Sequence, residues 1–471
     1  MSWCGENLRD LAGWDACGLR LTTPSNESAK LLDCVVRMIV SWRDCEELGG
    51  MGKILADLQA ADPDAALTRA LLMSFQAFSG ARSMETDETF KQAIEDCEKF
   101  TEESTTINDR ERKHLKASTL WSRGFFDEAQ STWEDILREY PNDLMAVKFS
   151  HESYFFTGNA REKRDGIARV LPHWKSSDPL KSFLHGMYAF GLEECGEFDK
   201  AEEHARLALR ENGKDAWATH ALAHVMEMTG RTKDERTFLE GTVQEWGSSW
   251  FANHTYWHSA LPYVEEGDFE SALTIFDKEI FPRTSALGTA SPLATIDAAS
   301  LLWRLELEGV DVGKRWTEIP DMSSHIHDHC LAASDAHYAY ILQRNGKLEQ
   351  AQELTGSLRN FITSGRPTFN HRVSEQIGMN LCEGMLAYAE GEYAKAVEHL
   401  SAIKATYGLT GSNAQNDIWT LTLINACLKT GTRDNALLAK SLLAERSEKK
   451  ANSGIGERLA KLVNIHTDLD Q

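Results

Sequence analysis

Apolar residues along this chain repeat mostly with the spacing of an α-helix, and glycines interrupt the pattern at regular intervals. Successive interrupting glycines stand 34 to 45 residues apart in the 471-residue sequence. They are Gly80, Gly124, Gly158, Gly196, Gly230, Gly267, Gly309, Gly346, Gly391 and Gly431. Only ten prolines occur in the whole chain, which also favours helix. The pattern predicts an all-α protein built from helix hairpins.

The residues after several of these glycines follow a common pattern. An aromatic or aliphatic residue comes two positions later and an alanine five positions later, as in Gly124-Phe126-Ala129. The same pattern recurs as Gly196-Phe198-Ala201, Gly267-Phe269-Ala272, Gly346-Leu348-Ala351 and Gly391-Tyr393-Ala396. Glycine permits a turn with positive φ, the large residue fills the hairpin, and alanine lets the helices pack closely. A 34-residue period that lengthens with insertions is typical of tetratricopeptide repeats.

Stacked hairpins of this kind predict a tetratricopeptide-like α-solenoid, a right-handed superhelix of about ten hairpins. We expect a lead-in and capping helix over residues 1–49, the repeats over 50–445, and a C-terminal capping helix or tail over 446–471. The stretches Pro282–Pro292 and Met322–Cys330 are predicted as loops that interrupt the regular stacking.

The charge balance limits the classes of partner. Fifty basic residues against 72 acidic ones give a formal net charge of −22, and there is no dense basic run. Nucleic acids and anionic membranes are therefore disfavoured. The nine cysteines form no C-x-x-C pair, and the N-terminus has neither a basic nor an apolar signal region. These features predict a soluble, cytoplasmic protein with reduced thiols.

Several segments together resemble the tetratricopeptide repeat protein 38 family over at least residues 110–445. They are KHLKASTLWSRGFFDEAQSTWEDILREYPNDLMAV (113–147), HGMYAFGLEECGEFDKAEEHARLAL (185–209), the histidine-bearing stretch 215–277 and TGSNAQNDIW (410–419). The family motif in the last segment is closer to G-G-S-H-A-Q-R-D, from which Thr410, Asn413 and Asn416 depart. The resemblance implies the repeat fold and a cytoplasmic setting, and no established reaction.

Two histidine pairs are the main candidate site. His220 with His224, and His254 with His258, are each four residues apart, so each pair shares one helix face. Counting from the turn glycines places both pairs on the stripe that faces the concave groove in tetratricopeptide repeats. Neighbouring helix axes lie about 8–10 Å apart, so the four imidazoles are predicted to converge. The residues expected around them are Trp217, Trp257, Glu193 and Glu227, with His337 on the same stripe of a later repeat.

Three interpretations of this cluster remain open. The groove could bind a small ligand or peptide segment, with the imidazoles donating to a carboxylate and titrating near pH 6.5. It could instead hold zinc as a metal-assisted hydrolase or lyase, with Glu227 or Glu193 as general base, although neither pair reads H-E-x-x-H. Finally, the histidines could serve packing alone in a scaffold that binds other proteins.

Two further segments carry candidate residues. His325, His327 and His329 alternate in a predicted loop, where a metal site competes with simple solvation. In the run 412–417, Asn416 or Asp417 could cap a helix that opens at Ile418, or Gln415 and Asp417 could reach into the groove. No nucleotide-binding glycine motif and no G-x-S-x-G motif occurs. The sequence therefore leaves catalysis undecided.

Overall fold

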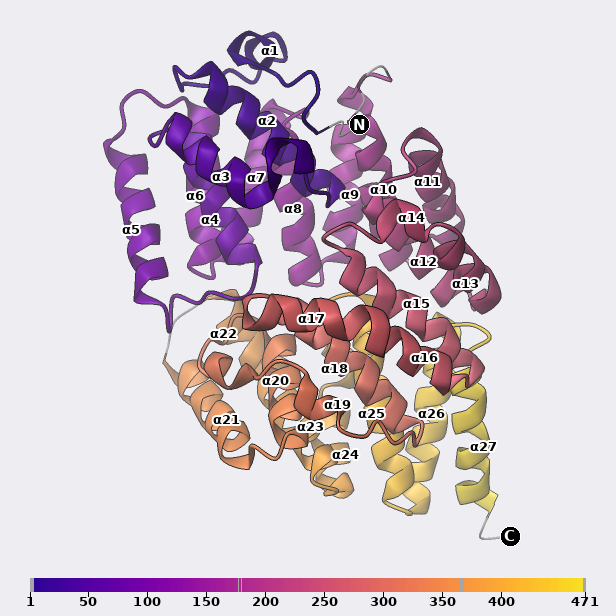
Figure 1. The fold of residues 1–471 in the computed structure, drawn as a ribbon. Helices are drawn as coiled ribbons and strands as arrows, with labels where there is room; N and C mark the ends of the chain where they lie inside the picture. The colour runs from indigo at the N-terminus through magenta and orange to yellow at the C-terminus, as the bar shows by residue number, and fades with distance from the viewer. Residues whose placement is uncertain (1–3, 177, 179, 365–367, 469–471) are drawn as a thin grey trace. The chain divides into compact units, whose positions relative to one another are not determined.

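A computed structural model describes residues 4–468, apart from 177, 179 and 365–367. Every regular element among these residues is a helix, as the periodicity predicts (Figure 1). The helices form hairpins of the tetratricopeptide type, so the all-α helical-repeat fold is confirmed. No helix in the described part of the chain is both long and apolar enough to cross a lipid bilayer.

The chain forms two compact units. Of the described residues, the first unit takes 4–78, 82–222 and 244–252, and the second takes 79–81, 223–243 and 253–468. The first contains α1 (Leu11–Ala16), α2 (Asn26–Ser41), α3 (Gly50–Ala61), α4 (Ala66–Phe78), α5 (Glu88–Glu103), α6 (Asp109–Ser122), α7 (Phe126–Glu139), α8 (Leu144–Phe156), α9 (Ala160–Val170), α10 (Lys181–Glu194) and α11 (Phe198–Glu211). The boundary falls inside α12 (Ala216–Met228), between Leu222 and Ala223, and again near α14 (Val243–Trp246).

The second unit holds the remaining helices. They are α13 (Thr232–Gly241), α15 (Ala252–Glu266), α16 (Phe269–Ile275), α17 (Phe281–Leu287), α18 (Pro292–Leu307), α19 (Arg315–Glu318), α20 (Ala332–Arg344), α21 (Leu348–Thr363), α22 (Phe369–Val373), α23 (Met379–Ala389), α24 (Tyr393–Ala402), α25 (Asn413–Lys429), α26 (Arg433–Lys449) and α27 (Gly454–Asp468). Short 3₁₀ or π turns join some of them, including η3 (Phe276–Ile280), η5 (Met322–His325) and η7 (Lys404–Thr410).

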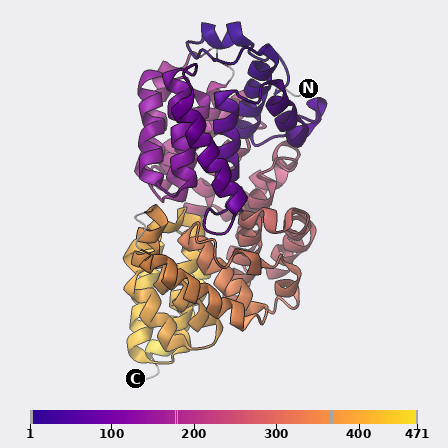
Figure 2. The same ribbon diagram turned by 90° about the vertical axis from the view of Figure 1, so that its left-hand side faces the viewer.

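Within each unit, helices adjacent in sequence pack against one another. In the first unit one such row runs from α4 through α6, α7, α8, α9 and α10 to α11. In the second unit the row runs from α20 through α23, α24, α25 and α26 to α27, which Figures 1 and 2 show from two sides. Sequential packing of this kind is expected when each repeat buries its apolar face against the next.

The turn between α6 and α7 shows how the repeated glycine works. Gly124 adopts φ +84° and the next residue, Phe125, donates its N–H to the Leu120 carbonyl at 2.9 Å. This hydrogen bond closes the Schellman cap that ends α6 and reverses the chain into α7. All ten glycines that mark the repeat in the sequence have positive φ. The positive φ that the pattern predicts is therefore confirmed at every one of them.

The alanines five positions after the turns are also where the pattern places them. Ala129, Ala201, Ala272, Ala351 and Ala396 are all at most 1% exposed. In the first of these hairpins Phe126 stacks on Trp121 with ring centroids 3.8 Å apart, so the aromatic residue does fill the turn. At the fourth, Leu348 is 49% exposed, so the prediction that it fills the hairpin is wrong there.

The predicted loop over Pro282–Pro292 is mostly helical. Helix α16 continues through the π turn η3 into α17, and Pro282 lies in the first turn of α17. Because the residues before Pro282 are already helical, its missing N–H removes one helical hydrogen bond, as at other helix irregularities that contain proline or a π turn. Pro292 likewise opens α18, so only the short 3₁₀ turn Gly288–Ala290 separates the two helices.

One turn glycine is constrained by packing as well as by its φ. A Cβ on Gly230 would lie 2.2 Å from the Ala451 carbonyl oxygen, whereas a Cβ on Gly431 would meet no atom within 4 Å. Both have positive φ. Gly431→Ala should therefore cost only the left-handed strain, about 1–2 kcal/mol. Gly230→Ala should cost about 1–3 kcal/mol more because backbone must move.

Thermal or urea unfolding of both variants beside the wild type measures this difference. Equal destabilisation by the two substitutions would show that the segment around Ala451 does not pack against the α12 turn.

Candidate functional site

Three of the four predicted histidines gather in the second unit. His224 comes from α12, and His254 and His258 come from α15, one turn apart. The ring centroids of His224 and His258 are 4.5 Å apart, and those of His254 and His258 are 4.8 Å apart. One nitrogen from each of the three rings lies within 4.8 Å of the others. The predicted convergence of the α12 and α15 stripes therefore holds for these three imidazoles.

A carboxylate stands beside each of the two α15 histidines. His254 Nδ1 lies 2.9 Å from Asp297 Oδ1 of α18, and His258 Nδ1 lies 3.3 Å from Glu227 Oε2 of α12. Burial lowers the pKa of His258 well below its ordinary value, and the nearby His224 lowers it further. His258 is therefore a neutral imidazole at neutral pH, held between two helices.

Glu227 faces the C-terminal segment with its other oxygen. Lys450 Nζ lies 2.8 Å from Glu227 Oε1 and 3.0 Å from Glu265 Oε1, and all three side chains are at most 7% exposed. Burial would raise the pKa of Glu227, but Lys450 and His258 outweigh it and hold this pKa well below the ordinary value. Glu227 is thus a buried, ionised carboxylate between a lysine and a histidine.

A second buried pair extends this ionic network. Arg446 of α26 forms a bidentate pair with Asp417 of α25, through distances of 2.8 and 2.7 Å, and its Nη1 donates to Ser453 Oγ at 2.8 Å. Ser453 in turn donates to Glu265 Oε2 at 2.8 Å. Arg446 and Lys450 pair directly with the carboxylates of Glu227, Glu265 and Asp417, and the buried Arg304 interacts with the same three groups electrostatically at longer range. Equal numbers of opposite charges let this interior stay ionised.

A cavity of about 270 Å³ lies beside the network, on the Lys450 side of Glu227. Its walls come from η7, α25, α26 and the end of α12. The buried Glu227, Arg446 and Lys450 line it together with the exposed Lys404, Glu445 and Lys449. Asn413, Asn416, Asp417 and Thr420 add polar groups. Buried charges therefore form its interior and exposed charges its rim.

Two residues predicted for the groove, Glu227 and Asp417, line this cavity. Asp417 does not cap a helix, because α25 already begins at Asn413 and Ser412 accepts the Gln415 N–H at its start. The prediction of a cap at Asn416 or Asp417 is therefore wrong. Asp417 pairs with Arg446 instead.

Trp257 and His337 are packed into the apolar core of the second unit. Trp257 is fully buried and stacks on His254 with centroids 5.3 Å apart. His337 of α20 is 5% exposed, lies 4.9 Å from Trp419 in an edge-to-face contact, and donates from Nδ1 to the Ala333 carbonyl at 2.7 Å. Their surroundings are those of core residues.

Three of the predicted residues, Trp217, His220 and Glu193, belong to the first unit. Trp217 stacks on Trp42 with centroids 5.8 Å apart, and His220 lies 5.0 Å from Trp217 and 4.9 Å from Phe251. The buried Lys148 lies over both tryptophans. Glu193, near the end of α10, is fully buried. These aromatic contacts describe a packed cluster on the N-terminal half of α12.

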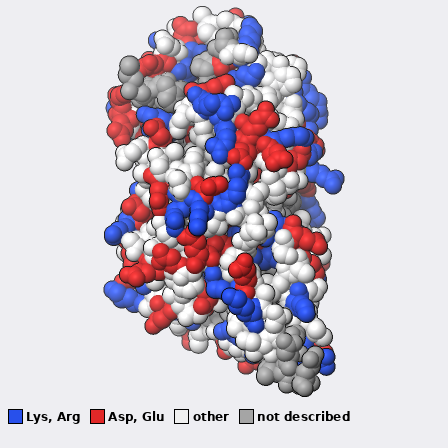
Figure 3. Space-filling model, turned by 90° about the vertical axis from the view of Figure 1, so that its right-hand side faces the viewer, with Lys and Arg blue, Asp and Glu red and all other residues white. Residues whose placement is uncertain are grey.

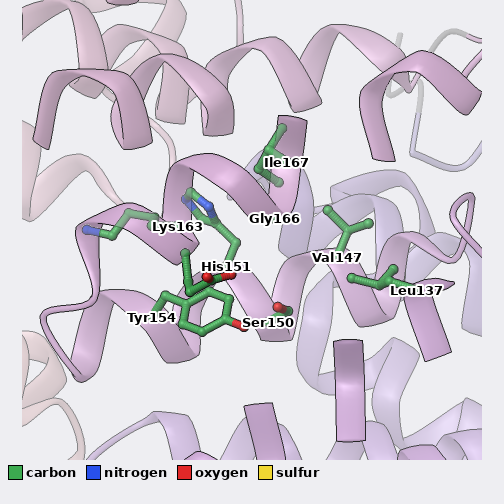
Figure 4. A pocket seen from close by; sticks show the side chains of 9 residues that line it. Leu137, Val147, Ser150, His151, Tyr154, Lys163, Gly166 and Ile167 are labelled. Atoms are coloured by element: carbon green, nitrogen blue, oxygen red, sulfur yellow. The ribbon is translucent and has the colours of Figure 1, made fainter. Parts of the chain in front are cut away.

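The first unit also contains a small internal space around His151, shown in Figure 4. His151 and Lys163 lie side by side there, with Leu137, Val147, Ser150, Tyr154 and Ile167 around them. Its volume is about 10 Å³, the size of one water molecule. It is a gap in the packing and too small for a ligand.

The histidine-rich loop has a different arrangement from the cluster. His325 contacts Asp328 at 2.6 Å and the Thr289 carbonyl at 3.2 Å, and His329 contacts Asp335 at 3.3 Å. The exposed His327 lies near Ser357 and Glu353. These histidines are held by side chains and backbone of their own surroundings.

Sequence reasoning missed Lys450, Arg446, Glu265 and Asp297. Lys450 and Glu227 are 223 residues apart, and no local pattern links them. Lys450 lies in the stretch 446–471, which the sequence predicts as a C-terminal capping helix or tail. It is four residues from Arg446, but α26 ends at Lys449, so the helical spacing rule does not apply to this pair.

No protein-family model matches the chain. The chain is similar to solved structures of human IFIT1 dimers. For the structure with m7Gppp-AAAA, the sequence identity is 15%, the alignment covers 99% of both chains and the TM-score is 0.38. For the structure with PPP-AAAA, the identity is 14%, the alignment covers 98% of both chains and the TM-score is 0.40. Cut9 from the APC/C Cut9-Hcn1 hetero-tetramer is 12% identical over 93% of this chain and 71% of that chain, with a TM-score of 0.43. At these values the likenesses carry no functional argument.

The buried ion network predicts a strong stability effect at Lys450. Lys450→Ala removes the cation between Glu227 and Glu265 and should destabilise the second unit by about 3–5 kcal/mol, because two buried carboxylates lose their partner. The matched control is Lys440→Ala, an exposed lysine on α26, which should change stability by less than about 0.5 kcal/mol. Chemical denaturation measures both. A loss in Lys450→Ala no larger than in the control would contradict the network.

His337 predicts a specific pH dependence. Burial lowers its pKa to about 4, whereas an unfolded histidine titrates near about 6.5. Between these values the unfolded chain binds a proton that the folded chain does not, so stability falls as pH falls, by about 1.4 kcal/mol per pH unit. By pH 5 the loss from this group should reach about 2 kcal/mol.

His337→Gln removes this titration. The decrease in stability between pH 7 and pH 5, measured by thermal unfolding, should be smaller in the variant than in the wild type. Parallel pH profiles for the two proteins would refute a neutral, buried His337.

Proposed function

We propose that this protein is a helical-repeat binding protein whose second unit holds a small polar ligand with an anionic group in the α25–α26 cavity. The observation that supports the proposal is the cavity itself, about 270 Å³ in volume and lined by charged and amide side chains. This volume is near the lower end of the range for small-molecule sites. It fits a small metabolite or the end of a peptide better than a long segment.

The charges of the lining favour an anion. Four cations, Lys404, Arg446, Lys449 and Lys450, face three carboxylates, Glu227, Asp417 and Glu445, in a chain that is strongly acidic as a whole. Arg446 and Lys450 are held in the buried network, and Lys404 pairs with Glu445 at 2.9 Å. Among the described ion pairs none includes Lys449, which is exposed at the rim. An incoming carboxylate or phosphate would meet this ammonium first.

The polar residues beside the cations would fix the orientation of a bound ligand. Asn416 is already fixed, because its amide donates to the Gly411 carbonyl at 3.1 Å and its oxygen accepts from Thr410 at 2.6 Å. A wall held by such hydrogen bonds keeps its shape before a ligand arrives, which lowers the cost of binding. The rigid wall and the cations at the rim together resemble a preformed site.

The distribution of charge on the surface and the net charge do not favour a polyanionic ligand. On the face of the molecule in Figure 3, basic and acidic side chains are interspersed. With a net charge of −22, long-range attraction of nucleic acid is weak. Membership of the tetratricopeptide repeat protein 38 family, cytoplasmic location and the absence of a nucleic-acid partner remain predictions from sequence.

The proposal is tested by thermal shift and calorimetry with inorganic phosphate, succinate and the peptide Gly-Gly-Gly as probes. A probe at 100 times its Kd should stabilise the protein by about 2.7 kcal/mol. Thr420→Trp fills the cavity and should abolish the response, and Lys449→Ala should weaken it. Lys440→Ala, outside the cavity on the same helix, should leave it unchanged.

Comparing succinate with the peptide distinguishes a free carboxylic acid from a peptide C-terminus as the source of the carboxylate. Stabilisation by succinate but not by the peptide indicates a free metabolite, and the reverse indicates a peptide C-terminus. If none of the probes stabilises the wild type, or if the response survives Thr420→Trp, the cavity does not bind such ligands and the scaffold interpretation is favoured.

A further inference from the structure

The histidine cluster lies on the other side of Glu227 from the cavity and has a different chemistry. His224, His254 and His258 come from two helices, and one nitrogen of each lies within 4.8 Å of the others. His224 and His258 are fully buried, and the side chain of His254 is 11% exposed. We propose that these three imidazoles form a binding site for a zinc ion.

The spacing of the nitrogens is close to what zinc requires. A tetrahedral zinc ion bound at about 2.0–2.1 Å holds its nitrogen ligands roughly 3.3 Å apart. The observed set, within 4.8 Å, reaches this geometry by shifts of roughly 1.5 Å or less, which imidazole rotations supply. Three histidines leave a further coordination position for water or another ligand.

Carboxylates beside two of the rings support the same conclusion. Zinc-bound histidines usually present their second nitrogen to a carboxylate, which fixes the ring and raises its basicity. Asp297 lies 2.9 Å from His254 Nδ1, and Glu227 lies 3.3 Å from His258 Nδ1. With Nδ1 of each ring facing its carboxylate, a metal ion would bind through Nε2.

The position of Glu227 is itself fixed. Lys450 holds its other oxygen at 2.8 Å, so the carboxylate beside His258 cannot swing away without breaking a buried ion pair. Glu227, Glu235 and His258 also offer donor atoms within 4.8 Å of one another. Burial raises the pKa of Glu235 well above its ordinary value, and the carboxylates of Glu227 and Glu265 raise it further.

The three rings of the cluster also contact one another. In the cluster, the carboxylates stand beside two of the rings and the three rings lie against one another. Imidazoles packed in this way disfavour protonation of each other, and they suit the ligands of a shared metal ion.

The test uses the 471-residue chain without a polyhistidine tag, stripped of metal with a chelator and titrated with Co²⁺ as a spectroscopic substitute for zinc. We expect one Co²⁺ per chain, visible absorption of a tetrahedral centre, and displacement by Zn²⁺. Asp297→Asn should weaken binding about 10–100-fold through loss of the carboxylate beside His254, and His254→Ala should weaken it further.

Two controls test whether the metal ion binds at the histidine cluster. His327→Ala changes an exposed histidine of the histidine-rich loop and should leave the titration unchanged. Thr420→Trp, which fills the proposed ligand cavity, should also leave it unchanged, so the two proposals fail independently. Circular dichroism checks that each variant is folded.

No tetrahedral spectrum in the wild type would overturn the proposal without any variant. A spectrum that persists unaltered in both His254→Ala and Asp297→Asn would place the metal elsewhere and would overturn it as well.

Discussion

The structure of the second unit depends on buried ion pairs between its C-terminal segment and helices far earlier in the chain. Lys450, just after α26, reaches Glu227 of α12 and Glu265 of α15, and Arg446 reaches Asp417 of α25. Groups of this kind are stable in the interior only while every charge is met. The C-terminal segment therefore completes the unit: without its two cations, three acidic side chains on three different helices would lose the cations that pair with them directly.

Glu227 connects the two candidate sites. One oxygen lies against Lys450, which lines the α25–α26 cavity, and the other lies against His258 of the histidine cluster. A fixed, ionised carboxylate thus separates a pocket with excess positive charge from a group of imidazoles. We propose a different ligand for each side, an anion in the cavity and a cation among the histidines.

Local features were predictable from sequence, and long-range ones were not. The ten turn glycines and the buried alanines follow from hairpin geometry, and the spacing of His254 and His258 places them on one face whatever surrounds them. The helical phase of α12 and α15 also predicted that their histidines converge. The pairing of Lys450 with Glu227 depends on how 223 intervening residues fold, so no pattern revealed it. Asp417 was expected in a cap because capping is a common local use of such a residue, yet Ser412 caps α25 first.

The direct interaction between Glu227 and Lys450 in the folded protein can be measured on its own. A double-mutant cycle compares the free energies of unfolding of the wild type, Glu227→Gln, Lys450→Met and the combined variant, and gives the coupling free energy between the two side chains. We expect the combined change to cost less than the sum of the single changes, by about 1–3 kcal/mol, because each single change leaves a buried charge without its partner. Additivity within about 0.5 kcal/mol would contradict this interaction.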